Sequence, residues 1–280
     1  MSVFVPGHIT GFFNIENYDS KLKNGSCGVG FLLSKGVSTT IQKSDSFDFE
    51  VNQGDDTVIR EVLDIFNLDN DDFKIIQDIQ LPIGAGFGTS AASALSLSLA
   101  LNEFLDLNYS MELCGQIAHM AEVNLGAGLG DVIAQTGHGL ILRTKPGAPG
   151  IGEIKSYSHD IYVAWKTFGP IETSEIIRDP KHKKIISEVG AKYLEMFEED
   201  PTLENFLAFS LRFSEETKLM TDEVKNQIDY FNSMDNILGS SMAMLGNTVF
   251  AFAYDEDAFK NMDVEGLHID KLNNNGIIYD

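Results

Sequence analysis

Residues 82–92 have the sequence PIGAGFGTSAA, and this stretch decides the fold. Residues 73–80 before it alternate as a β-strand does, and the small and apolar residues 91–105 after it predict a helix. Glycine at positions 84, 86 and 88 allows the backbone to approach a ligand closely. Because a helix begins with unpaired N–H groups and a positive dipole end, this loop favours a phosphate site. The alternative is a turn that only packs a helix against a sheet.

Two other phosphate-binding patterns are absent from the sequence. The Walker pattern needs a lysine before the hydroxyl residue, and none precedes Thr89 or Ser90. The dinucleotide pattern needs a third glycine where this chain has Thr89, and a second glycine loop at residues 126–130 has Asp131 in that place. A nicotinamide-linked oxidoreductase is therefore disfavoured. The hydroxyls of Thr89 and Ser90 can still cap the helix, bind phosphate or ligate Mg²⁺.

The chain is strongly acidic. Its 280 residues contain 20 Lys plus Arg and 42 Asp plus Glu, so its formal net charge is −22. Such a chain repels phosphate backbones and anionic lipids, and we expect no nucleic-acid or membrane partner. An anionic substrate would need a metal ion, helix N-termini or a few placed cations. The apolar fraction of 43% and the charged fraction of 22% are typical of soluble globular proteins.

Cysteine usage and the N-terminus bear on the location of the protein. Cys27 and Cys114 form no CxxC or Cys/His cluster, which disfavours a zinc site or a disulfide framework and indicates a reducing cytosol. The N-terminal residues lack the basic region of a signal peptide, and the longest apolar stretch, residues 91–101, is far short of a membrane span. We therefore predict a cytoplasmic protein.

The order of predicted elements gives an α+β fold. Strands are expected at residues 2–6, 28–33, 37–42, 73–80, 139–143 and 160–167 and after Gly246, and helices at residues 57–66, 91–105, 111–123, 180–197, 203–218 and 222–234. Ser110 is the predicted N-cap of the helix at 111–123. Two prolines and three glycines within residues 145–152 mark the predicted boundary between domains 1–150 and 151–280.

Residues 82–92 resemble the central P-x-x-x-G-[LF]-G-[ST]-S-A-A motif of the GHMP kinases, which include galactokinase, homoserine kinase, mevalonate kinase and phosphomevalonate kinase. Two further motifs follow the family's order: residues 5–11, VPGHITG, resemble the N-terminal P-G motif, and residues 245–251, LGNTVFA, resemble the C-terminal glycine motif. The resemblance implies a two-domain GHMP kinase fold that binds ATP at the glycine loop. The implied nucleotide-binding residues are Gly84, Ala85, Gly86, Phe87, Gly88, Thr89 and Ser90.

Within the superfamily, the phrases VPGHITGFF, GSCGVGF and MLGNTVFA resemble the archaeal-type pantoate kinases. His8 stands where other members commonly have Lys or Arg, which speaks against a standard mevalonate kinase. The resemblance implies ATP-dependent phosphorylation of pantoate to 4-phosphopantoate, on the route to coenzyme A, with Mg²⁺ as the metal. Two alternatives stay open: another small-molecule GHMP kinase of the mevalonate or sugar type, and a non-catalytic sensor that binds ATP. A homodimer is a compatible assembly.

The resemblance also assigns roles to single residues. Ser90 and Glu122 match the family's metal ligands, and the alternatives are a helix N-cap and a surface glutamate. Asp131 matches the catalytic aspartate, which can accept or orient the proton of the acceptor's hydroxyl, and the alternative is an N-cap. The presence of all three residues disfavours the sensor.

Three residues are expected on the side of the acceptor. Ser26 and His119 match the family's substrate-binding positions, and the alternatives are an ordinary turn serine and a structural histidine. Arg143 ends a predicted strand shortly after Asp131. Because Arg binds a carboxylate with two hydrogen bonds, we predict that Arg143 holds the carboxylate of pantoate, and the alternative is a surface ion pair.

Overall fold

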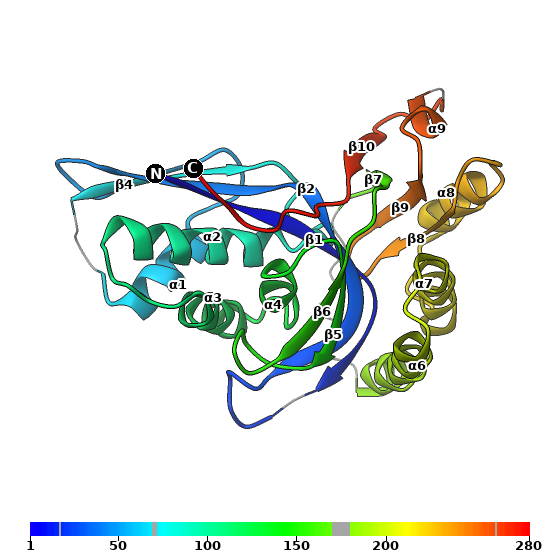
Figure 1. Cartoon of the computed structure of the whole chain (residues 1–280), viewed down its shortest axis with the longest axis horizontal. Coiled ribbons are helices and arrows are strands. Elements are labelled where there is room, and N and C mark those ends of the chain that lie inside the picture. Colours follow the sequence, from blue (N-terminus) through cyan, green and yellow to red (C-terminus); the bar gives the residue numbers. More distant parts are fainter. Residues whose placement is uncertain (17, 69–71, 170–179, 261) are drawn as a thin grey trace.

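Apolar residues near the N-terminus form two long paired strands, β1 (Ser2–Glu16) and β2 (Gly25–Lys43), in the computed structural model of the chain (Figure 1). The structure describes residues 1–16, 18–68, 72–169, 180–260 and 262–280. In this part of the chain, β1 and β2 are the centre of a mixed sheet with the order β11-β1-β2-β4-β3. The outer strands are β3 (Asp48–Val51), β4 (Phe73–Ile79) and β11 (Ile278–Tyr279).

The same sheet continues through a hairpin on the other half of β2. β5 (Leu140–Lys145) pairs with the first half of β2, and β6 (Glu153–Tyr157) pairs with β5. A second, antiparallel sheet of the described residues has the order β10-β7-β9-β8. Its strands are β7 (Tyr162–Thr167), β8 (Gly239–Ala243), β9 (Thr248–Ala253) and β10 (His268–Lys271).

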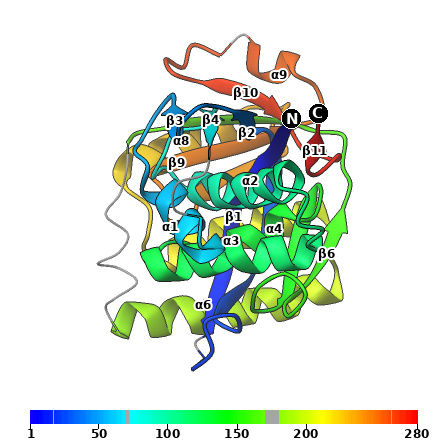
Figure 2. The same ribbon diagram turned by 90° about the vertical axis from the view of Figure 1, so that its left-hand side faces the viewer.

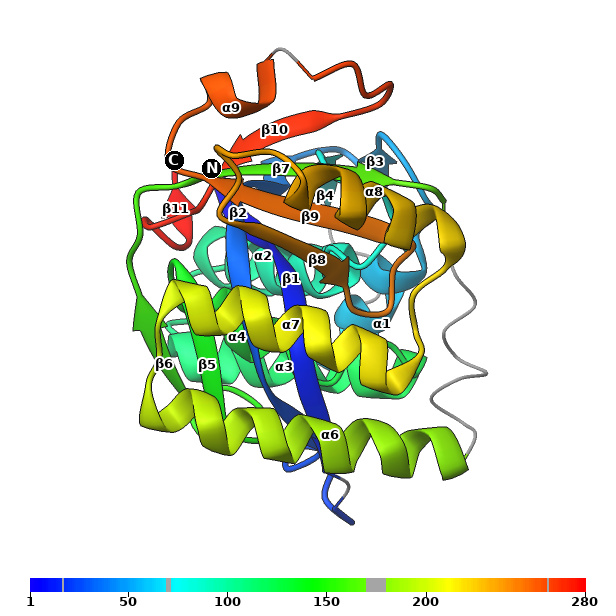
Figure 3. The same cartoon turned by 90° about the vertical axis from the view of Figure 1, so that its right-hand side faces the viewer.

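Helices cover β1 from two sides. α1 (Thr57–Phe66), α2 (Thr89–Phe104), α3 (Met111–Leu125) and the short α4 (Asp131–Gln135) form one group, with α2 in front of β1 in Figure 2. α6 (Pro180–Glu199) and α7 (Leu203–Thr217) pack on β1 from the opposite side, as Figure 3 shows, and α8 (Asp222–Asn232) packs on β8 and β9. α9 (Asp257–Lys260) is a single turn before β10.

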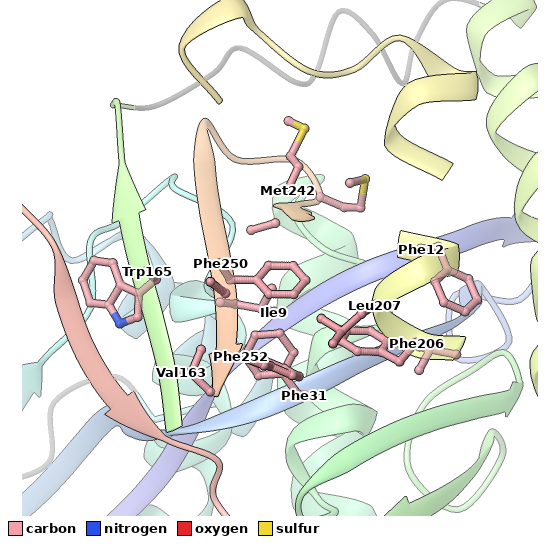
Figure 4. Packing of buried hydrophobic residues seen from close by; sticks show 14 of the residues in the cluster. Ile9, Phe12, Phe31, Val163, Trp165, Phe206, Leu207, Met242, Phe250 and Phe252 are labelled. Atoms are coloured by element: carbon pink, nitrogen blue, oxygen red, sulfur yellow. The ribbon is translucent and has the colours of Figure 1, made fainter. Parts of the chain in front are cut away.

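A cluster of aromatic rings joins the two sheets. Phe31 of β2 lies edge-on to Phe250 and Phe252 of β9, with ring centroids 5.0 and 4.8 Å apart. Phe206 of α7 stacks on both β9 rings, and Figure 4 shows these side chains gathered between the strands. Because the rings come from both halves of the chain, their burial fixes the second sheet against the first.

Most predicted elements are present, and the differences arise where strands pair with distant segments of the chain. The helix predicted at residues 57–66 has those bounds, and Ser110 caps α3 by accepting from the backbone N–H of Leu113. The strands predicted at 28–33 and 37–42 are parts of the one strand β2, because Gly36 pairs with Pro6 and the ladder continues. The first strand runs on to Glu16, and β3, β6, β8, β10 and β11 were not predicted.

The predicted boundary at 145–152 falls inside a hairpin, since these residues connect β5 to β6 within the first sheet. The described chain passes to the second sheet between Tyr157 and Tyr162. The division into domains 1–150 and 151–280 stays a prediction. Among the described residues, no helix is both long enough and apolar enough to cross a membrane. Cys27 and Cys114 are buried free thiols.

Candidate active site

The three motifs found in the sequence meet at the glycine loop between β4 and α2. Gly84, Gly86 and Gly88 have φ angles of 72°, 88° and 59°, which favour glycine. From the first motif, the backbone N–H of His8 donates to the carbonyl of Phe87 at 2.9 Å. From the third, the hydroxyl of Thr248 donates to the carbonyl of Ala85 at 2.7 Å. The loop is therefore held from both halves of the chain.

The start of α2 is open to an anion. Its N-cap is Gly88, no side chain caps it, and its first turn contains no acidic residue. The first N–H groups of the helix and its positive dipole end therefore remain available to a phosphate. Ser90 lies inside the first turn, so it is not the N-cap. Its hydroxyl instead donates to Oε1 of Glu122 at 2.5 Å.

Glu122 is a carboxylate enclosed by the protein. It lies in the last turn of α3 with 1% of its surface exposed. Burial, together with the negative charge of Asp131, raises the pKa of Glu122 to about 8, although hydrogen bonds from Ser90 and Gly128 oppose the shift. A cation beside it would reverse this shift.

Ser90 and Glu122 fit a hard cation such as Mg²⁺, which prefers oxygen ligands. In the described part of the chain, no group of three or more His, Cys, Asp or Glu side chains could hold a metal ion. Such a cation would therefore take its other ligands from substrate phosphates and water, which is usual for Mg²⁺ in phosphoryl transfer.

Asp131, His8 and Arg143 form a row. Asp131 is the first residue of α4, whose N-cap is Gly130, so the capping alternative does not hold. Oδ1 of Asp131 lies 2.7 Å from Nδ1 of His8, and Nε2 of His8 lies 3.3 Å from Nη1 of Arg143. Burial opposes ionisation of Asp131, but the hydrogen bond from His8 and the positive charge of Arg143 hold its pKa below the ordinary value. Asp131 is therefore an ionised carboxylate.

Arg143 is buried, with 1% of its surface exposed, so it is not a surface ion pair. Its guanidinium donates to the carbonyl and hydroxyl of Ser26 at 3.3 and 3.5 Å and to the hydroxyl of Thr10 at 3.4 Å. It forms no ion pair with a carboxylate of the described residues. A buried guanidinium whose nearest opposing charge, Asp131, acts only from beyond ion-pair distance favours an anionic ligand.

A cavity of about 460 Å³ opens beside this row. Its polar lining comes from Asp131, Arg143, Ser26 and Thr10. Gly86 and Gly88 of the glycine loop also line it. The apolar lining consists of Phe13, Ile15, Val123, Ala127, Leu129, Met244 and Leu245. Such a site suits a small molecule that combines an anionic group with an apolar part.

His119 lies apart from the residues that line the cavity. Its Nε2 is 3.1 Å from the carbonyl of Lys21, in the connection between β1 and β2, and its ring is buried. Burial lowers the pKa of His119, so its ring is neutral. The structure brings Ser26, Asp131 and Arg143 together without it, and its contact with the acceptor stays a prediction.

His8 and Thr10 lie at the site and were not predicted as site residues. Both are polar residues of the otherwise largely apolar strand β1, in the part that pairs with β2. The signal in the sequence was the presence of histidine after the P-G motif, where the resemblance implied Lys or Arg.

Comparisons with known proteins identify the family of the chain. Residues 56–139 match the GHMP kinases N terminal domain. The chain is 37% identical over 257 residues to a pantoate kinase of Methanocaldococcus jannaschii, covering 91% of this chain and 93% of the relative. It is 34% identical over 276 residues to a pantoate kinase of Thermococcus kodakarensis, covering 92% and 89%.

A solved structure described as a phosphotransferase related to the CoA biosynthesis pathway superposes with a TM-score of 0.85 at 29% identity, covering 99% of this chain and 98% of that one. Sequence identity above 30% over nearly the full length, together with this superposition, decides the family. The chain belongs to the GHMP kinases and, within them, to the pantoate kinase family.

Proposed function

We propose that the protein transfers the γ-phosphoryl group of ATP to the terminal hydroxyl of pantoate, giving 4-phosphopantoate for coenzyme A biosynthesis. The observation that carries the proposal is a cavity in which an ionised aspartate and a buried arginine lie beside an open phosphate loop. Pantoate has a carboxylate at one end, a primary hydroxyl at the other, and two methyl groups on the carbon adjacent to the one that bears this hydroxyl. These parts correspond to the cationic, acidic and apolar parts of the cavity lining.

The residues divide the reaction between them. Arg143 binds the carboxylate of pantoate through paired N–H groups, and Ser26 adds a hydroxyl beside it. Asp131 accepts the proton of the attacking hydroxyl or orients that hydroxyl toward the phosphorus. Residues 84–90 and the start of α2 hold the phosphate chain of ATP through backbone N–H groups. Phosphoryl transfer depends mostly on such positioning and on neutralising charge.

Ser90 and Glu122 would hold the metal of this reaction. A bound Mg²⁺ supplies positive charge that offsets the charge of the phosphates. A carboxylate with a pKa of about 8 has little favourable charge pairing from the protein itself, so a cation is the partner that the site lacks among its described residues.

A panel of acceptors tests the proposed function. With MgATP, we expect turnover of pantoate and much weaker turnover of 2,4-dihydroxybutanoate, which lacks the two methyl groups. Loss of two methyl contacts with the apolar lining should lower kcat/KM by about 10- to 100-fold. Product formation is measured by mass spectrometry, with mevalonate, homoserine and galactose in parallel. Turnover of one of these three and none of pantoate would refute the substrate and leave the kinase fold intact.

The raised pKa of Glu122 predicts a pH-dependent stability. In the folded state the carboxyl holds its proton up to about pH 8, whereas the unfolded chain releases it near the ordinary value. The unfolded state is therefore favoured progressively as pH rises through this window, by on the order of 5 kcal/mol. Glu122→Gln removes the effect, so we expect a Tm about 5 °C or more above wild type at pH 8 and a similar Tm at pH 5.

Added Mg²⁺ provides the second arm of this experiment. It should raise the Tm of the wild-type protein at pH 8 and have much less effect on Glu122→Gln, and the variant should need more Mg²⁺ for turnover. An unchanged Mg²⁺ response in the variant would remove Glu122 from the metal site.

The homodimer and the cytoplasmic location predicted from the sequence are also parts of the proposal. Sedimentation tests the homodimer, and cell fractionation tests the location.

A further inference from the structure

His8 lies between the two groups on which the proposed reaction depends. It is wholly buried in β1. Its Nδ1 contacts Oδ1 of Asp131 at 2.7 Å, and its Nε2 contacts Nη1 of Arg143 at 3.3 Å. The two residues come from α4 and β5, so His8 joins side chains that the chain supplies from separate elements.

The partners determine where the ring proton lies. A guanidinium only donates hydrogen bonds, so Nε2 of His8 must accept from Arg143 and carry no proton. The proton of the neutral ring is then on Nδ1, where it donates to the carboxylate of Asp131. Burial, together with the positive charge of Arg143, lowers the pKa of His8, although the bond to Asp131 opposes this. A neutral ring of His8 is also what its hydrogen bonds to Asp131 and Arg143 require.

The ring has little freedom to move. A Cβ on Gly30 of β2 would lie 2.3 Å from Nε2 of His8, so only glycine leaves room for the ring at that place. The backbone N–H of His8 is also bound to the carbonyl of Phe87 in the glycine loop. One residue therefore contacts the phosphate loop, the aspartate and the arginine.

We propose that His8 is a positioning residue that holds the carboxylate of Asp131 toward the acceptor's hydroxyl, with Arg143 fixing the tautomer of the ring. The proposal rests on the proposed function in one respect, the action of Asp131 on a hydroxyl, and it does not depend on which acceptor carries that hydroxyl. A Lys or Arg at this position would place a second buried cation against Arg143. A neutral histidine allows the arginine to bind an anion while the aspartate stays oriented.

Three substitutions separate the two nitrogens of the ring. The side-chain amide of Asn can place an N–H near Nδ1, whereas that of Gln reaches toward Nε2. We expect His8→Ala and His8→Gln to lower kcat by about 10- to 100-fold, as loss of a hydrogen bond to a charged group does, and His8→Asn to recover most of it. The KM for ATP should stay nearly constant. Equal kcat values for the Asn and Gln variants would overturn the proposal.

The pH profile distinguishes positioning from a merely structural role. Asp131 is faced by His8 from β1, Arg143 from β5 and Glu122 from α3. When the bond from His8 is removed, the burial of Asp131 is opposed only by the charge of Arg143, so its pKa rises and the acidic limb of kcat should move to higher pH. A structural role would lower all rates without moving that limb. His182→Ala, which removes the bond from His182 of α6 to the carbonyl of Thr217 of α7, is the matched control.

The wild-type protein gives a test that needs no variant. Long-range ¹H–¹⁵N NMR reports which ring nitrogen carries the proton, and we expect Nδ1–H for His8 at neutral pH. A proton on Nε2, or on both nitrogens, would overturn the proposal even if the variants failed to fold. If pantoate proves not to be the acceptor, the same kinetics are measured with the hydroxy compound that is turned over, so the two failures are distinguishable.

Discussion

Asp131→Asn is expected to lower kcat for pantoate by about 10²- to 10⁴-fold while leaving the affinity for ATP nearly unchanged. An amide cannot accept the hydroxyl proton, and its N–H group faces the Nδ1–H of His8 if it takes the place of Oδ1. The backbone of the phosphate loop does not depend on this side chain. Steady-state kinetics measure the loss, and calorimetric titration of ATP measures nucleotide binding.

Asp222→Asn is the matched control for this substitution, because Asp222 is likewise the first residue of a helix, α8, and is exposed. It should keep wild-type kinetics. If Asp131→Asn also kept a near-native kcat, Asp131 would be a structural residue and the base would have to be another group. A lower kcat accompanied by weaker ATP binding would place the carboxylate on the nucleotide instead.

Short-range patterns carried most of what the sequence predicted correctly. The glycine loop and the helix after it are local features, because positive φ angles at Gly84, Gly86 and Gly88 and an apolar run of small residues are encoded within the segment itself. The helix at 57–66 and the cap at Ser110 likewise depend on side chains a few residues apart. The assignment of the chain to the GHMP kinases followed from three such local motifs and is confirmed.

Elements that depend on distant partners were missed. β11 is two residues that form a strand only because β1 offers an edge, and β3 pairs in parallel with β4 across a helix. Neither has a hydrophobic period of its own. The 145–152 stretch has the composition of a linker, yet it closes a hairpin because β6 pairs with β5. Strand pairing is decided by tertiary contacts, which single-segment patterns do not contain.

The residues of the site also divide into those that local patterns predicted and those that depend on distant contacts. Asp131 and Arg143 were predicted from residue type and family position, and the structure brings both to one cavity. The contact between His8 and Asp131 joins residues 123 positions apart, so no spacing in the sequence indicates it. His119 shares α3 with Glu122, and neither is among the residues that line the cavity; the ring of His119 bonds to the carbonyl of Lys21, whereas Glu122 bonds to Ser90 at the start of α2.

Arg143→Ala is expected to raise the KM for pantoate by roughly 10- to 150-fold, because a charge-assisted hydrogen bond contributes about 1.5–3 kcal/mol. The protein has a net charge of −22, and Arg143 is the basic side chain among the described residues that line the cavity. Without it, the carboxylate of the acceptor would face Asp131 with no compensating charge. Substrate titrations with pantoate and with ATP measure the two KM values, and that for ATP should change little.

Two further variants show which property of Arg143 matters. Arg143→Lys keeps the charge and loses the planar fork, so it should recover only part of the affinity for pantoate. Arg60→Ala removes an exposed arginine of α1 that pairs with Asp56, and it controls for the change in net charge. Because the guanidinium also donates to Ser26 and His8, the fold of each variant is checked by its Tm and by its ATP affinity. A folded Arg143→Ala variant whose ATP KM rises while its pantoate KM stays at the wild-type value would assign this end of the cavity to the nucleotide, and the acceptor would then have to enter from the side of Met244 and Leu245.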